Sequence, residues 1–137
     1  MARDLLRDAD VLAVVAAGGA LGATARWAAE VAVPQAGPDR IPWATFTVNV
    51  VGCLLMGVLM WFVLEAWGQR RYARPFLGVG VLGGFTTFSA YAAETYGMAD
   101  AGAWLAAAAY VTGTVVAGLL AVRAGYLLGR VVSVRRD

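Results

Sequence analysis

Histidine and lysine are absent from this 137-residue chain, and cysteine occurs once. No disulfide framework, zinc site or Cys/His nucleophile can therefore be assembled within one chain, and we expect no enzyme. The single cysteine, Cys53, lies in an apolar run, where the expected role is that of a small buried hydrophobic side chain. Every basic residue is arginine, which together with the abundance of Ala, Gly and Val indicates a bias in base composition.

Charge is scarce as well. Only 15% of the residues are charged and the net charge is +2, with scattered arginines, which excludes nucleic acid as an expected partner. Hydrophobic residues make up 61% of the chain and the mean hydropathy is +0.68, whereas soluble domains are about half apolar and a quarter charged. We therefore predict a multi-pass protein of the cell inner (plasma) membrane, whose first apolar segment is retained as a span.

Four segments are apolar for the roughly 20 residues that a helix needs to cross a bilayer. They cover residues 11–33, 42–67, 75–98 and 103–128. The connections are short, so we predict an all-α membrane protein with one four-span domain, residues 1–137. Glycines spaced four apart predict close helix packing in lipid. These pairs are Gly18 and Gly22, Gly80 and Gly84, and Gly125 and Gly129.

The third span contains Gly83-Gly84-Phe85-Thr86-Thr87-Phe88-Ser89. Two adjacent glycines are poor helix formers, and three hydroxyls follow them. Irregular backbone at membrane depth is tolerated only where protein buries it or where it lines a wet cavity. We therefore predict a break at the glycine pair, and such a break indicates an ion or substrate site.

Polar side chains recur at helical spacing in the second and fourth spans. Thr45 and Asn49 share one helix face, and so do Tyr110 and Thr114. An amide in lipid needs partners, so Asn49 is expected either to make an interhelical hydrogen bond or to face a pore as a donor.

In the third span, Phe88, Tyr91 and Glu94 recur every three residues. The aromatic pair could simply pack, and Glu94 could face protein or water, or lie at the level of the lipid headgroups. Arg26, near the end of the first span, could snorkel to headgroups or form a positive vestibule for anions. Because no carboxylate lies at the centre of any span, this set suits passage of an ion better than proton coupling.

Three segments together resemble one family, the CrcB/Fluc fluoride channels. They are Gly18-Gly19-x-x-Gly22-Ala23-x-x-Arg26-Trp27, Thr45-x-x-Val48-Asn49-x-x-Gly52 and Gly80-x-x-Gly83-Gly84-Phe85-Thr86-Thr87-Phe88-Ser89. The resemblance covers essentially the whole chain. It implies a passive fluoride exporter built as a dual-topology dimer of oppositely inserted subunits, with two pathways along the interface. It also implies a structural sodium ion at the dimer centre, held by the carbonyls of Gly83 and Thr86.

The same resemblance assigns a fluoride pathway. Its members would be Asn49, Phe88, Tyr91, Thr45, Thr87, Ser89, Tyr110 and Thr114, with Arg26 at a vestibule and Glu94 on the third span. Two residues depart from the family pattern, since Tyr91 stands where a second Phe is expected and Gly118 where another hydroxyl is expected.

Arginine is distributed unevenly between the two sides of the predicted membrane domain. The side with both termini and residues 68–74 carries Arg3, Arg7, Arg70, Arg71, Arg74, Arg130, Arg135 and Arg136, against Arg40 and Arg26 on the other. This bias places the termini in the cytoplasm. The chain could therefore form an antiparallel homodimer or pair with an oppositely oriented paralogue. Alternatives from other classes are a small proton-coupled multidrug antiporter and a non-conducting partner subunit.

Overall fold

The computed structural model describes residues 2–33, 37, 40–66 and 71–134, and these residues are helical apart from short connections. Among these residues, four helical stretches are long and apolar enough to cross a membrane, which confirms the predicted number of spans. The elements are α1 (Ala2–Ala32), α2 (Trp43–Trp61), η1 (Phe62–Ala66), η2 (Arg74–Leu82), α3 (Gly83–Phe85), α4 (Phe88–Asp100) and α5 (Trp104–Val134).

The first and last helices extend beyond the apolar segments from which they were predicted. The helix α1 begins at Ala2, before the apolar run, and α5 continues to Val134. Hydropathy predicts only the part of a helix that lies in lipid, because charged residues at its ends remain helical in water. The wider π-helical turns of η1 and η2 could not be predicted, because hydropathy does not distinguish a π-helix from an α-helix.

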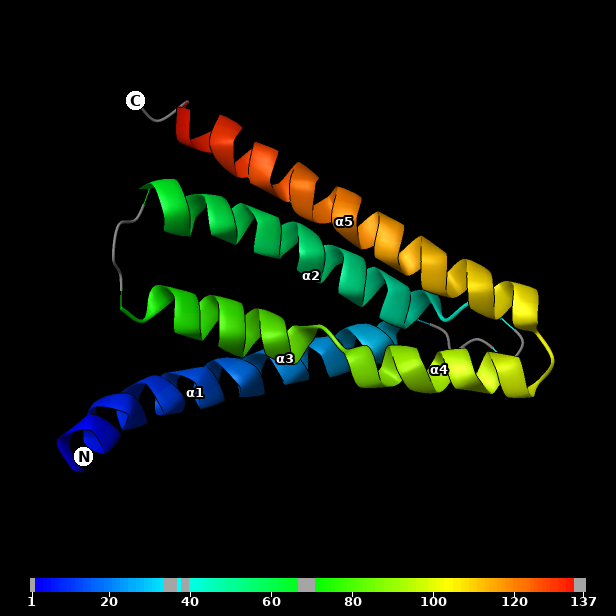
Figure 1. Cartoon of the computed structure of the whole chain (residues 1–137), viewed down its shortest axis with the longest axis horizontal. Helices are drawn as coiled ribbons and strands as arrows, with labels where there is room; N and C mark the ends of the chain where they lie inside the picture. Colours follow the sequence, from blue (N-terminus) through cyan, green and yellow to red (C-terminus); the bar gives the residue numbers. More distant parts are fainter. Residues whose placement is uncertain (1, 34–36, 38–39, 67–70, 135–137) are drawn as a thin grey trace.

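The spans pack in two pairs. The helix α5 lies along α2, and α1 lies along η2 and α3, while α4 continues the third span toward the far end of the bundle (Figure 1). The start of α1 and the end of α5 lie at the same end of the bundle, on the left of Figure 1. Successive spans of the described chain therefore run in alternating directions, as expected of four spans with short connections.

Glycines lie where the helices of each pair touch, and we call these contact lines the glycine seams. A Cβ atom on Gly22 would overlap the carbonyl oxygen of Val81, and one on Gly18 would lie 2.5 Å from the carbonyl oxygen of Phe76. In the other pair, a Cβ atom on Gly125 would overlap the carbonyl oxygen of Leu54. The predicted close packing is confirmed, since the absent side chains let helix backbones meet.

A tight turn reverses the chain between α4 and α5. Gly102 has a φ angle of +76°, which side chains with a Cβ atom rarely adopt. The amide of Ala103 then donates to the carbonyl of Met98 at 2.8 Å, and the amides of Ala101 and Gly102 donate to the carbonyls of Gly97 and Ala99 at the end of α4.

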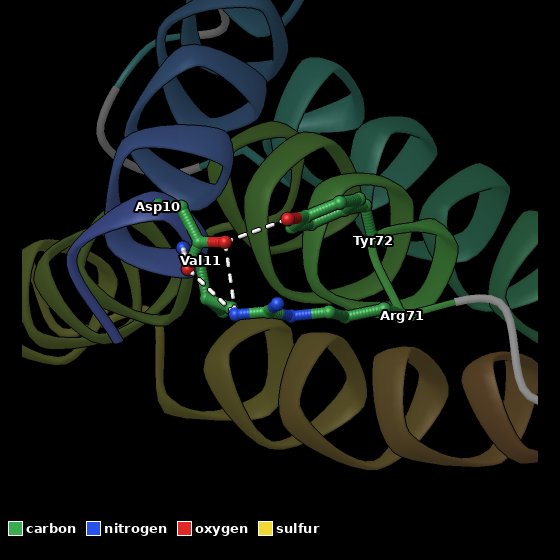
Figure 2. A network of polar contacts seen from close by, with 4 residues as sticks. All are labelled: Asp10, Val11, Arg71 and Tyr72. Carbon is green, nitrogen blue, oxygen red and sulfur yellow. Dashed lines mark hydrogen bonds and ion pairs between the residues drawn. The ribbon is translucent and has the colours of Figure 1, made fainter. Parts of the chain in front are cut away.

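A polar clamp joins the first span to the start of the third (Figure 2). The Asp10 carboxylate accepts a hydrogen bond of 2.6 Å from the Tyr72 hydroxyl and forms an ion pair of 2.8 Å with Arg71. The hydrogen bond to Asp10 raises the pKa of Tyr72, so this hydroxyl stays a donor. The side chains are partly exposed, so the clamp sets the register of the two helices more than it adds stability.

We predict that Gly22→Ala disrupts the pairing of α1 with the third span, because the new methyl group overlaps the Val81 carbonyl. The expected cost is about 1–3 kcal/mol of unfolding free energy, read as a lower unfolding temperature in detergent. Gly19→Ala is the matched control, since a Cβ atom there meets nothing within 4 Å. Equal losses in the two variants would contradict this account of the seam.

Candidate functional site

The third span is broken, but three residues later than the sequence predicts. Gly83 is helical, with φ −66° and ψ −35°, and the helix continues to Phe85. Thr86 (φ −78°, ψ 157°) and Thr87 (φ −143°, ψ 126°) are extended, and α4 begins at Phe88. The prediction of a break was right, and its assignment to the glycine pair was wrong.

Asn49 of α2 explains this position. Its Oδ1 atom accepts a hydrogen bond of 2.8 Å from the amide of Thr87, and its Nδ2 atom donates one of 2.9 Å to the carbonyl of Thr87. In an unbroken helix that amide would donate to the carbonyl of Gly83. The Asn49 side chain replaces the helical bond and so stabilises the break from a neighbouring span.

Thr87 also starts the next helix. Its hydroxyl accepts a hydrogen bond of 3.1 Å from the amide of Ala90, as an N-cap residue does, and lies 3.2 Å from the hydroxyl of Ser89. The preceding Thr86 donates its hydroxyl back to the carbonyl of Leu82 at 2.9 Å. The three hydroxyls after the glycines are thus largely engaged in shaping the break.

A groove of about 320 Å³ opens beside the break. Its walls are Asn49, Cys53, Thr86, Thr87, Phe88, Tyr91, Thr114 and Val115. Five of the predicted pathway residues therefore meet here, from the second, third and fourth spans. Sequence reasoning missed Cys53 and Val115 as lining residues; the spacing of Cys53, one turn beyond Asn49, was the available signal for the first.

The hydroxyl oxygen of Thr114 is buried and has no hydrogen-bond partner among the described residues. Thr114 is one of the groove residues, and its hydroxyl has a hydrogen that no described residue accepts. A buried hydroxyl without a partner costs free energy, so an ion in the groove would remove this cost.

Aromatic rings form one side of the groove. The ring centroids of Phe88 and Tyr91 are 5.8 Å apart, and those of Tyr91 and Tyr110 are 5.2 Å apart. Phe88 is 79% exposed in the single chain, so its ring has few contacts that would explain it by packing within the subunit. The Tyr91 hydroxyl makes only a long hydrogen bond, 3.4 Å, to the carbonyl of Val111.

Glu94 lies in a separate polar cluster. One carboxylate oxygen accepts a hydrogen bond of 2.6 Å from Thr45, and the other accepts one of 2.8 Å from Tyr110. Thr45 and Tyr110 are 2% and 1% exposed, and Tyr110 packs with Met98 and Ala107. Of the alternatives for Glu94, the structure supports a contact with protein, because both oxygens bind neighbouring spans.

The structure does not bring all predicted pathway residues into the groove. Thr45, Glu94 and Tyr110 are connected to it through the ring of Tyr91. Ser89 and Arg26 are not among its lining residues. Arg26 lies on α1 one turn beyond Gly22, on the helix that faces η2 and α3.

Comparison with known proteins assigns the chain to a family. A family model described as CrcB-like protein, Camphor Resistance (CrcB), matches residues 13–126. The fluoride-specific ion channel FluC 2 of Nocardia farcinica is 48% identical over 122 residues, which cover 89% of this chain and 84% of that protein. The chain belongs to the CrcB family.

Two further CrcB relatives agree. The fluoride-specific ion channel FluC 1 of Mycobacterium bovis is 49% identical over 126 residues, or 91% of this chain and 94% of that protein. FluC 2 of Streptomyces avermitilis is 51% identical over 107 residues, or 77% of this chain and 66% of that protein. The resemblance drawn from three motifs is confirmed, and this CrcB chain is a multi-pass membrane protein and not an enzyme.

We predict that Thr45→Val destabilises the CrcB fold, because it removes the 2.6 Å hydrogen bond to Glu94 and leaves a half-buried carboxylate oxygen without this donor. The expected loss is about 1–3 kcal/mol, measured by thermal unfolding in detergent. Thr47→Val is the control, since Thr47 lies on the same helix but is exposed. A Thr45→Val unfolding temperature equal to that of Thr47→Val would show that the bond contributes nothing.

Proposed function

We propose that this CrcB chain is a fluoride-selective channel that passively exports cytoplasmic fluoride. The observation that carries the proposal is the groove at the break, where neutral donors and aromatic rings meet in a chain about half identical to proteins named fluoride-specific ion channels. Fluoride is small and strongly hydrated, so a selective path must replace its water with strong donors and still release it. Thr114 has a free hydroxyl hydrogen for this purpose, and Asn49 has a second amide hydrogen.

The aromatic rings suit the same ion. The edge of an aromatic ring is positive in its quadrupole, so Phe88 and Tyr91 can present ring hydrogens to an anion. No carboxylate is among the groove residues. The carboxylate of Glu94, which an antiporter would have to titrate, binds two hydroxyls beside the groove, and this favours the channel over the proton-coupled alternative.

The proposed assembly is an antiparallel dimer with two pathways. Its support is the open side of the groove, where the highly exposed Phe88 ring would meet a second subunit. The arginine bias toward the end with both termini supports the alternative of an oppositely oriented paralogue. The relatives carry the numbered names FluC 1 and FluC 2, which is consistent with such pairs.

We further propose a sodium ion at the dimer centre, bound by the carbonyls of Gly83 and Thr86. The donor set fits, because the amide that would occupy the Gly83 carbonyl in a helix donates to Asn49 instead. Thr86 is extended, so its carbonyl also lies outside the helical ladder. The described residues hold no group of three His, Cys, Asp or Glu side chains that would favour a divalent ion. Uncharged oxygens suit a monovalent cation, whose charge would lower the cost of an anion at this depth.

We predict fluoride efflux from liposomes that contain the purified chain, with no chloride efflux above protein-free liposomes. The reason is the uncharged donor lining of the groove, which supplies no coupling group. Fluoride is measured with a selective electrode under clamped voltage. Efflux that stops when the pH gradient is collapsed would support the antiporter instead, and efflux only after a paralogue is added would support the heterodimer.

We predict that Phe88→Ile lowers the fluoride flux to about a tenth, the change for roughly 1.4 kcal/mol, because only an aromatic edge offers positive ring hydrogens. Since Phe88 is 79% exposed, the subunit itself should stay folded. Tyr91→Phe is the control and should keep the flux, because the Tyr91 hydroxyl makes only the 3.4 Å bond. Wild-type flux in Phe88→Ile would remove this ring from the pathway.

A further inference from the structure

Cys53 lines the groove, whereas the sequence led us to expect only a small buried hydrophobic residue. It lies on α2 one turn beyond Asn49, and its side chain is half-buried. Asn49, Thr87 and Thr114 line the same groove. The thiol therefore shares a mainly apolar groove with one amide and two hydroxyl side chains.

Opposite Cys53, the fourth span has no side chain. Gly118 lies on α5 one turn beyond Thr114 and is buried. A Cβ atom built on Gly118 would lie 3.3 Å from the Cys53 sulfur, closer than such contacts usually are. The thiol therefore occupies the space that a side chain at position 118 would otherwise fill.

The neighbouring turn supplies an independent sign of a ligand. The Thr114 hydroxyl oxygen is buried and has no hydrogen-bond partner among the residues that the structure describes. Thr114 and Asn49 both line the groove, and one turn further along their helices Gly118 of α5 lies beside Cys53 of α2. An ion moving along α5 from Thr114 meets no side chain at 118, and the Cys53 sulfur lies 3.3 Å from the position of a Cβ atom there.

We propose that the Cys53 thiol donates to the passing anion and takes the role of the side chain missing at Gly118. This inference rests on the proposed fluoride conduction and adds a residue that determines its rate. A thiol is a weak donor, so it would contact the ion without trapping it. The recognised ligand is a small anion, and the contact requires only the S–H group of Cys53 and the space beside Gly118.

Fluoride flux from liposomes tests the proposal with a small set of variants. Cys53→Ala should lower the flux about threefold to tenfold, the effect of one lost hydrogen bond, and Cys53→Ser should keep it. Removal of the sulfur also makes room at 118, so Cys53→Ala/Gly118→Ser should fold and regain the flux. Cys53→Ala/Gly118→Ala fills the same space without a donor and should stay low. Elution from a gel-filtration column checks that each variant assembles.

Equal recovery in the two double variants, or wild-type flux in Cys53→Ala, would overturn the proposal and reduce Cys53 to a packing residue. Neither result would touch the proposed function, since the wild-type chain would still conduct. A wild-type chain with no fluoride flux would overturn the proposed function and this inference with it.

Chemical modification of the thiol provides a second test, of whether Cys53 faces the ion path. Cys53 is the only cysteine in the sequence, so silver nitrate in chloride-free buffer can react with a thiol at one position only. Silver should block fluoride flux in the wild-type chain and leave Cys53→Ala/Gly118→Ser unaffected. Wild-type flux that persists in silver would show that the thiol does not face the ion path.

Discussion

The pair of hydrogen bonds between the Asn49 side chain and the backbone of Thr87 is the interaction on which the remaining structure depends. Breaking a helix within a membrane leaves an amide and a carbonyl without partners, each at a cost of several kcal/mol in lipid. The Asn49 side chain accepts from the freed amide of Thr87 at 2.8 Å and donates to the carbonyl of the same residue at 2.9 Å, whereas the Gly83 carbonyl loses its helical partner. The extended backbone at Thr87 is stabilised because a second span supplies a partner for its amide and one for its carbonyl.

The break in turn positions the groups of the groove. Thr87 caps α4, which sets the rotation of that helix and turns Tyr91 toward Tyr110. Glu94, one turn further on, then bonds Thr45 and Tyr110 and so ties α4 to both α2 and α5. Glycine seams bring the spans close enough for these short polar contacts. The result is a groove held by hydrogen bonds between spans on one side and open, at Phe88, on the other.

Much of this arrangement could be predicted from the sequence, because it depends on local properties. The four spans follow from apolar length and the seams from glycine spacing. The place of the break could not be predicted, since it depends on a contact between Asn49 and Thr87, 38 residues apart. Glycine can adopt helical backbone angles where its amide is hydrogen-bonded, and Gly83 therefore stays helical. The spacing of Cys53 from Asn49 indicated that Cys53 could line the groove, but only the packing of α2 against α5 shows that its sulfur lies beside Gly118.

Amide hydrogen exchange at Thr87, measured by NMR on the chain in detergent micelles, tests the central claim most directly. Although Thr87 lies outside any helix, its amide should exchange slowly in the wild-type chain, because it donates to Asn49. In Asn49→Ala that protection should be lost, while the Thr86 amide, which donates to the carbonyl of Leu82, should stay protected. A Thr87 amide that exchanges freely in the wild-type chain, or one that stays protected in Asn49→Ala, would contradict the account.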